Sequence, residues 1–150
     1  MSLTVALVGC SQIKARHACE AQVLYKSPLF VASVQYSKRI ADHWFILSAK
    51  YGTTEPDRRI EPYDQQLIKP KKGHFGLCEC PEAFDRTTVP IRARDDLKIV
   101  VLAGKVYYDS MHDWMKQKAI LPMAGLQLGE RLQWLNKQNS GNETQRLLFD

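Results

Sequence analysis

Four short apolar runs along the chain predict buried strands. They cover residues 3–8, 44–47, 97–103 and 119–122, and the third of them, LKIVVLA, is the clearest. Continuous apolar runs are typical of parallel strands, because helices cover both faces of a parallel sheet. Helical patterns separate these runs. The order of elements therefore predicts a single α/β domain with a mostly parallel central sheet of about four strands flanked by helices.

Apolar residues at helical spacing predict four helices in and after the gaps between these runs. One is expected over residues 18–25. A second starts at Ser27, which would cap a helix that has Pro28 at its first position. A third follows Gly104, and the last covers residues 126–135. These helices would supply the layers that bury both faces of the sheet.

Residues 53–96 form the least regular part of the chain. They hold five of the seven prolines and show little periodicity. A structureless segment of this length is unusual in a compact domain and is commonly functional, so we expect a long irregular insertion. The domain itself is expected to span residues 1–138, followed by a polar, flexible tail over residues 139–150.

The length and composition are those of one domain in a reducing compartment. A chain of 150 residues suffices for one hydrophobic core, and no stretch approaches the roughly 18 apolar residues that a membrane span needs. The first apolar run is short and follows no Lys or Arg, which argues against a signal peptide. We therefore expect a cytoplasmic protein whose cysteines are thiols or ligands. The net charge of +5 favours a polyanionic partner.

Each of the first three predicted strands ends in a segment that has a lysine close to a glycine. The lysines are Lys14, Lys50 and Lys105. Ligands of parallel sheets bind beyond the carboxyl ends of the strands, so we expect three ammonium groups and several backbone amides around one crevice. Such a crevice suits a phosphate or a carboxylate. Further candidates for substrate or phosphate binding at these ends are Ser11, Ser48, Tyr51, Tyr63 and Gly104.

Cys10, in the segment GCSQIK, has two interpretations. Cysteine is commonly a small buried residue, and a strand end is an ordinary place for one. The alternative is a nucleophile that Lys14 and the following helix N-terminus would activate. The spacing is not that of a Walker loop. Asp64 and Lys50 are the other catalytic candidates, since Asp64 belongs to an acidic segment that could supply an acid or base over the crevice.

The segment GHFGLCEC raises the question of a metal. His74, Cys78 and Cys80 are residue types that bind zinc. Their spacing is not a standard one, because C-x-C replaces the usual C-x₂-C and no second matching pair exists. We therefore expect no cofactor, with zinc on these three residues as the alternative.

The last six residues, QRLLFD, place apolar side chains after a polar segment. Exposed Leu and Phe are unfavourable in water, so this end is expected to dock somewhere. It could pack on its own domain. Alternatively, Gln145, Leu148 and Phe149 resemble the QxxLF peptide by which bacterial polymerases and repair proteins bind the sliding clamp.

Several motifs in order resemble one known family of domains. The segments VGCSQIK, LYKSPLF, LSAKYG and PYD resemble the signature of small bacterial, archaeal and phage domains of unknown function, over most of residues 4–135. That resemblance implies an α/β fold distantly similar to the YaaA proteins, which are associated with DNA binding and oxidative stress. More faintly, the Cys-Ser-x-x-Lys turn resembles the catalytic core of archaeosine synthase, which acts on a modified guanine in tRNA. Residues 67–97 depart from the family pattern, which would place a helix there.

Carried over by position, the motif residues of that family correspond to Cys10, Ser11, Lys14, Tyr25, Ser27, Ser48, Lys50, Tyr51, Gly52, Pro62, Tyr63, Asp64 and Gly104. The function expected from these residues is that of a nucleic-acid-associated enzyme acting on a nucleobase or nucleotide, most simply in modification or repair of DNA. Two alternatives stay open. One is a non-catalytic DNA-binding accessory protein of replication or repair, and the other is a hydrolase or transferase of free nucleotides. No membrane partner is expected.

Overall fold

The computed structural model describes residues 3–77 and 94–149, with side chains described as far as residue 140. A central sheet of five strands has the order β4-β3-β1-β6-β7. Four of the strands run parallel, and β4 pairs with β3 in the antiparallel direction. The strands are β1 (Leu3–Gly9), β3 (His43–Ser48), β4 (Gly52–Thr54), β6 (Leu97–Leu102) and β7 (Ala119–Ile120). The predicted class, an α/β domain with a mostly parallel sheet, is confirmed.

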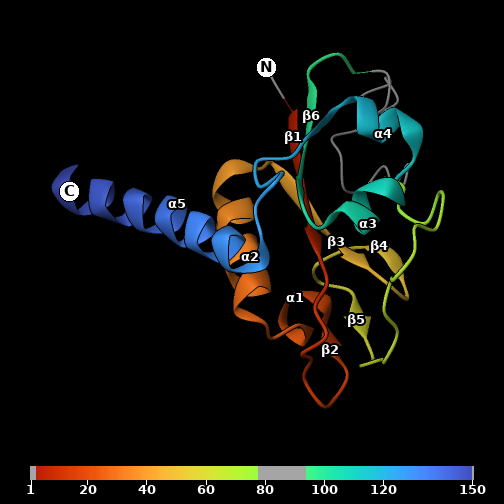
Figure 1. Ribbon diagram of the computed structural model, residues 1–150. Coiled ribbons are helices and arrows are strands. Elements are labelled where there is room, and N and C mark those ends of the chain that lie inside the picture. Colours follow the sequence, from red (N-terminus) through yellow and green to blue (C-terminus); the bar gives the residue numbers. More distant parts are fainter. Residues whose placement is uncertain (1–2, 78–93, 150) are drawn as a thin grey trace.

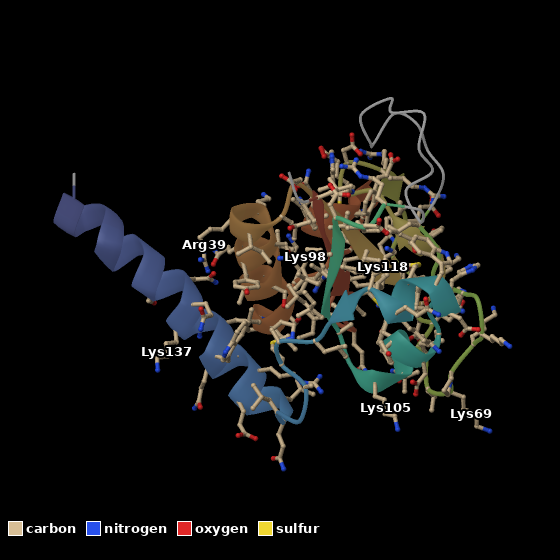
Figure 2. The ribbon with its side chains drawn as sticks, turned by 90° about the horizontal axis from the view of Figure 1, so that it is seen from above. Arg39, Lys69, Lys98, Lys105, Lys118 and Lys137 are labelled. Atoms are coloured by element: carbon tan, nitrogen blue, oxygen red, sulfur yellow. The ribbon has the colours of Figure 1, made fainter. Side chains whose placement is uncertain are left out.

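Helices cover the two faces of this sheet, as Figure 1 shows. On one face lie α2 (Pro28–Ile40) and α5 (Leu128–Phe149), and on the other lie α3 (Lys105–Asp109) and α4 (Asp113–Gln117). Figures 1 and 2 both show α5 running along α2 and then extending beyond the rest of the domain. The two helices pack through Tyr36 and Trp134, whose ring centres are 5.3 Å apart. No helix of the described residues is long and apolar enough to cross a bilayer.

The period of two along each strand divides the core into two clusters. On the side of α2 and α5, the buried residues include Val8 from β1 and Leu102 from β6. On the side of α3 and α4, they include Leu7, Val101 and Met115. Consecutive strand residues therefore point into opposite clusters and are buried in both. This double burial is the reason that the strands appear in the sequence as continuous apolar runs rather than as alternating ones.

Ser27 caps α2 as its sequence position predicts. Its hydroxyl oxygen accepts a hydrogen bond from the backbone N–H of Phe30 at 3.1 Å, and Pro28 is the first helical residue. The cap satisfies one of the N–H groups that a helix start leaves without a partner, and proline lacks the N–H that would need another. The start of α2 is thereby fixed beside the carboxyl end of β1, where Gly9 and Cys10 lie.

One predicted helix in the first half is wrong. The helix over residues 18–25 is instead a two-residue strand, β2 (Cys19–Glu20), and a single helical turn, α1 (Ala21–Leu24). β2 pairs with β5 (Arg59–Ile60), which lies in the segment expected to be irregular. The backbone N–H of Ala21 also donates to Arg58 O at 2.8 Å. These partners lie about 40 positions away in the chain, so the tertiary contact overrides the local helical spacing.

The boundaries of two helices also differ from the predictions. The single helix expected after Gly104 is split into α3 and α4, because the backbone of Phe75 pairs with Met111 between them. The last helix does not end at Leu135 but continues as α5 to Phe149. Its polar continuation contains no proline, and one interior glycine costs a helix only about 1 kcal/mol.

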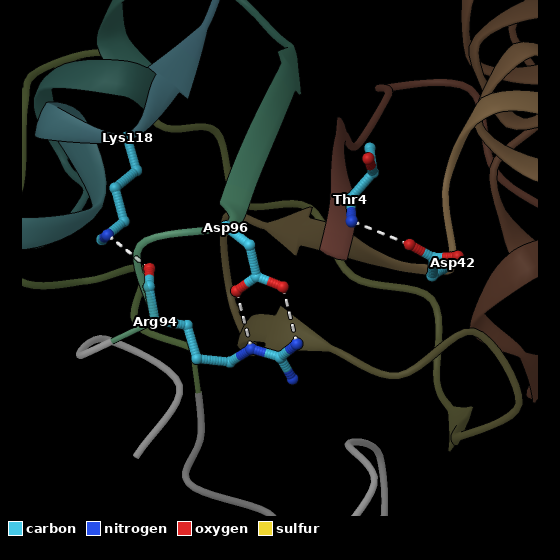
Figure 3. A network of polar contacts seen from close by, with 5 residues as sticks. All are labelled: Thr4, Asp42, Arg94, Asp96 and Lys118. Atoms are coloured by element: carbon cyan, nitrogen blue, oxygen red, sulfur yellow. Dashed lines mark hydrogen bonds and ion pairs between the residues drawn. The ribbon is translucent and has the colours of Figure 1, made fainter. Parts of the chain in front are cut away.

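Polar contacts tie together the amino ends of the parallel strands, as Figure 3 shows. The backbone N–H of Thr4 donates to the carboxylate of Asp42 at 2.8 Å. Arg94 binds both carboxylate oxygens of Asp96, at 2.9 and 2.8 Å, and these bonds hold the pKa of that carboxyl below its usual value. Lys118 donates to Arg94 O at 2.7 Å. These ties lie at the edge of the sheet opposite to the one where ligands of parallel sheets bind.

Gly9, the last residue of β1, lies against the end of the neighbouring strand β6. A Cβ built on Gly9 would be 3.0 Å from Cβ of Ala103, which is tighter than most contacts of this kind in proteins. We predict that Gly9→Ala lowers the free energy of unfolding by about 1–3 kcal/mol, because the strand ends must move apart.

Gly129→Ala is the matched control, since a Cβ on Gly129 meets nothing within 4 Å and alanine favours helix. Denaturant unfolding of the two variants measures both effects. Equal unfolding midpoints for Gly9→Ala and the natural protein would contradict the tight contact.

Candidate functional site

The connections of β1 and β6 leave the sheet in opposite directions. β1 continues through α2 to β3 on one side, and β6 continues through α3 and α4 to β7 on the other. The two strands are neighbours, with Val8 opposite Leu102. Where adjacent parallel strands feed crossovers on opposite faces, the chain separates beyond their carboxyl ends and leaves a crevice, which is the usual ligand site of such sheets.

A cavity of about 660 Å³ lies at this point. Its volume is within the range of small-molecule sites, about 300–1,000 Å³. The ends of β1 and β6 form its floor, and the first turns of α2 and α5 contribute to its walls. Of the residues predicted from the sequence to form a site, it is lined by Cys10, Ser11, Lys14 and Gly104. Below, this space is called the main cavity.

Cys10 contacts a tyrosine hydroxyl on one wall of the main cavity. Its Sγ lies 3.3 Å from the hydroxyl oxygen of Tyr107, which is in α3 and also lines the cavity. Burial, and after it the negative charge that Cys10 can carry, raises the pKa of Tyr107. The hydroxyl thus stays protonated at neutral pH. It can hydrogen-bond the sulfur and exchange a proton with it.

A second group of hydroxyls lies beside Cys10. The hydroxyl of Tyr63 is 2.7 Å from that of Tyr25 and 2.7 Å from Ser48 Oγ. Ser48 Oγ in turn accepts a hydrogen bond from the backbone N–H of Tyr51 at 3.0 Å. Below, the tyrosine cluster means Tyr25, Tyr63 and Ser48. Because the three hydroxyls bond one another, the buried phenols are not left without partners.

Burial is the largest effect on the ionisation of this cluster. It raises the pKa of Tyr25 to about 12, and it raises the pKa of Tyr63 well above its ordinary value. The charge of Cys10 is the second cause for Tyr63 and a smaller one for Tyr25. Cys10 is thus coupled electrostatically to phenols on both sides, the tyrosine cluster and Tyr107.

Lys14 links the cluster to the main cavity. Its ammonium lies 4.5 Å from the ring centre of Tyr63 and 5.9 Å from that of Tyr25, within cation–π range. The backbones of Lys14 and Tyr25 form an isolated antiparallel bridge, which fixes the turn after β1. Ser11 donates its hydroxyl to Ile13 O at 2.9 Å inside this turn. Lys14 is therefore a positioned cation. Its ammonium also donates to Gln12 O at 3.4 Å, and among the described residues it forms no ion pair with a carboxylate.

The three lysines expected around one crevice are not brought together. Lys50 is exposed, and its ammonium lies 5.3 Å from the ring centre of Tyr51, outside the lining of the main cavity. Lys105 extends outward from the start of α3 (Figure 2) and lines a smaller neighbouring cavity. Asp64 is exposed and also outside the main lining. Sheet order explains the difference, because β3, which precedes Lys50, is one strand removed from the junction of β1 and β6.

Tyr107 and Arg131 line the main cavity and were not among the site residues predicted from the sequence. Arg131 is the charged one of the two. It lies in the first turn of α5, and its Nε donates to Leu126 O at 3.0 Å. A cation is unfavourable at a helix N-terminus, where the helix dipole is positive. An arginine in that turn therefore indicates a role other than stabilising the helix, such as binding a ligand. The signal was weak, since nothing local places α5 beside β1.

The metal and tail predictions rest on residues that are only partly described. His74 is described, and its Nε2 lies 2.9 Å from Ala49 O, so it braces the turn after β3. Cys78 and Cys80 lie outside the described residues. Within the described part of the chain, no group of three or more His, Cys, Asp or Glu side chains could hold a metal. Gln145, Leu148 and Phe149 belong to α5, but their side chains are not described, so the clamp contact stays a prediction.

Comparison with known proteins places the chain in one family. The sequence profile of DUF6884, a family of unknown function, matches residues 5–137. The chain belongs to this family. All the residues that line the main cavity fall within this match, which ends within α5. The cavity is therefore a feature of the DUF6884 domain of this chain. No curated protein and no solved structure matches the sequence significantly. The finer likeness to the YaaA proteins and to archaeosine synthase stays a prediction.

The raised tyrosine pKa values predict a loss of stability in alkali. In the unfolded chain a tyrosine releases its proton near pH 10, whereas folded Tyr25 holds it to about pH 12. The stability that this difference contributes is complete below pH 10 and is lost as the pH rises to about 12. We expect Tyr25 to account for about 1–2 kcal/mol of that loss.

Denaturant unfolding at a series of alkaline pH values measures this loss. Tyr25→Phe should show a shallower decline above pH 10 than the natural protein. Tyr36→Phe, a change on α2 outside the tyrosine cluster, should keep the full decline. Identical slopes for Tyr25→Phe and the natural protein would show that the buried phenol does not retain its proton.

Proposed function

We propose that this protein is an enzyme that modifies a nucleobase, most simply in DNA, and that the target nucleotide occupies the main cavity. One observation carries the proposal. A thiol in contact with a protonated phenol lines the same cavity as a cation whose electrostatic partners are aromatic rings. The thiol and phenol supply covalent and proton-transfer chemistry, and the cation supplies a site for phosphate.

Lys14 and the starts of two long helices are suited to bind the phosphate of the nucleotide. Lys14 lines the main cavity, and so do the first turns of α2 and α5. Backbone N–H groups at a helix start and the positive end of the helix dipole both favour an anion. A phosphate held there would place the attached sugar and base toward Cys10 and Tyr107, which lie on the same lining.

The chemical step that suits Cys10 is addition to an electron-poor ring carbon of the base. The sulfur forms a bond to that carbon, and the π electron pair of the ring double bond moves to the neighbouring ring atom. That atom takes up one proton while the thiol releases one. Tyr107 is placed to relay it, accepting the thiol proton as it donates its own. The addition balances in atoms and electrons and needs no further reactant.

Exposed apolar side chains favour a base within a strand over a free nucleotide. Ile13 and Leu128 are 60% and 70% exposed, and both lie on the lining of the main cavity. Apolar side chains at the mouth of a site can contact the bases next to the target nucleotide. The net charge of +5 supports a polyanionic partner, as does the resemblance of the motifs to DNA-associated proteins.

Binding and adduct formation test this proposal together. We expect the protein to bind a short single-stranded oligonucleotide with an affinity that falls steeply as salt rises, because phosphate contacts release counterions. Intact-protein mass spectrometry should show a species heavier by the oligonucleotide. Cys10→Ser should keep the salt-dependent binding and lose the heavier species, since serine is a far weaker nucleophile at neutral pH.

Cys19→Ser is the matched control, because Cys19 is the other described cysteine and lies in β2, outside the lining of the main cavity. It should keep both binding and adduct. Binding without any adduct in the natural protein would favour the non-catalytic DNA-binding alternative. Binding of free nucleotides but not of oligonucleotides would favour the free-nucleotide alternative.

The tail carries a separate proposal, contact with the polymerase sliding clamp. The last turns of α5 extend away from the domain in Figure 1, so they are placed to meet a partner. Removing residues 145–150 should abolish co-elution with the clamp on a sizing column and leave oligonucleotide binding unchanged. Co-elution that survives this truncation would exclude the QRLLF segment as the contact.

A further inference from the structure

A smaller cavity of about 230 Å³ adjoins the main cavity on the other face of the sheet. Val101 lines it, and the next residue along the strand, Leu102, lines the main cavity instead. Lys105 and Tyr108 from α3 form another part of its wall. The two cavities therefore lie on either side of the chain that leaves β6.

Three residues are shared by the linings of the two cavities. They are Ala103, Met123 and Arg131. Arg131 is the charged member, and it is partly buried. Among the described residues no carboxylate forms an ion pair with it. A partly buried guanidinium without a counter-charge favours the binding of an anion from outside the chain.

The guanidinium of Arg131 is held through Nε, and among the described residues its two terminal nitrogens form no hydrogen bond. Its Nε donates to Leu126 O at 3.0 Å, which fixes the side chain at the start of α5. Its Nη1 lies 3.7 Å from the position that a Cβ on Gly104 would occupy. The two terminal nitrogens, which form a fork suited to phosphate oxygens, are thus near the point where the cavities meet.

Gly104 lines the main cavity and lies beside Arg131. Its backbone angles, φ −73° and ψ 172°, are accessible to any residue, so the conformation does not require glycine. A side chain at residue 104 would instead point toward the guanidinium of Arg131. The missing side chain therefore provides space beside a cation, at the junction of two cavities.

We infer that Arg131 binds a second phosphate, one beyond the phosphate of the nucleotide in the main cavity, and that this phosphate reaches the smaller cavity past Gly104. Lys105 supplies a second positive charge there. The inference rests on the proposed function, and it specifies the substrate as a nucleotide with two successive phosphates. Either the terminal phosphate of a nucleoside diphosphate or the next internucleotide phosphate of a strand has this chemistry.

Calorimetric titration of the full chain tests the inference with ligands that differ by one phosphate. The ligands are the deoxynucleoside monophosphates, the matching diphosphates, dinucleotides with a 5′ phosphate, and inorganic pyrophosphate. The second phosphate should tighten binding by about tenfold or more, as expected for a charged, forked hydrogen-bond pair. If only the diphosphates bind more tightly, the second phosphate comes from a free nucleotide. If only the dinucleotides do, it comes from a nucleic acid strand.

Lys105→Ala should leave the monophosphate affinity nearly unchanged, because Lys105 lines only the smaller cavity. Arg131 and Gly104 also line the main cavity, so each variant is judged by its own gain, which is the ratio of its diphosphate to its monophosphate affinity. Arg131→Ala should abolish the gain, and Arg131→Lys should keep only part, because lysine keeps the charge and loses the fork. Gly104→Ala should reduce it by placing a methyl group beside Nη1. Lys105→Ala should reduce it several-fold. Lys98→Ala is the control, since Lys98 is exposed near the amino end of β6, away from both cavities.

The outcomes separate this inference from the proposed function. Equal affinities for ligands with one and two phosphates would overturn the inference and leave nucleotide binding intact. Pyrophosphate binding that depends on Arg131, without binding of any nucleotide, would support the anion site and overturn the nucleotide assignment. Binding of no ligand would overturn both. If circular dichroism shows that Arg131→Ala does not fold, the exposed change Lys105→Ala and the small change Gly104→Ala decide the result.

Discussion

Burial of β1 on both faces and at both edges is the constraint on which the structure depends. Val5, Ala6 and Leu7 have no exposed surface, and the strand is hydrogen-bonded to β3 on one side and to β6 on the other. Its end is therefore held by a strand at each edge and by a layer of helices on each face. The turn that follows, from Cys10 to Lys14, is presented to the crevice by a rigid base, as precise chemistry requires.

The cavity combines groups that would each be ordinary in isolation. Cys10 is close to Tyr107 on one side and to the buried hydroxyls of Tyr63 and Tyr25 on the other. Desolvation keeps these phenols protonated, so a sulfur anion would face proton donors rather than competing negative charges. Lys14, above the face of Tyr63, adds a cation that forms no ion pair with a carboxylate among the described residues. The same burial that stabilises the fold thereby raises the pKa values of the phenols in the site.

The main strands of the sheet could be predicted from the sequence, whereas the residues that surround the site could not. β1, β3 and β6 were predictable because double burial makes each a continuous apolar run. The edge where Cys10, Lys14 and Gly104 meet followed from the rule for parallel strands. Strand order did not follow, and it separates Lys50 from the main cavity. Arg131 and the pairing of β2 with β5 depend on contacts between segments distant in the chain, which no local pattern records.

The position of α5 makes the cavity depend on the docking of the last helix. This helix is the last element of the chain, yet its first turn supplies Arg131 and Leu132 to a cavity whose floor begins at Gly9. It is fastened to α2 by the contact of Tyr36 with Trp134 and by a hydrogen bond from the Asn139 side chain to Ala32 O. Any molecule that binds across the cavity is thermodynamically linked to this docking, because it binds only when the helix is in place. Ligand occupancy would therefore protect the amides of α5 from hydrogen exchange more than those of the central strands, which are buried with or without it.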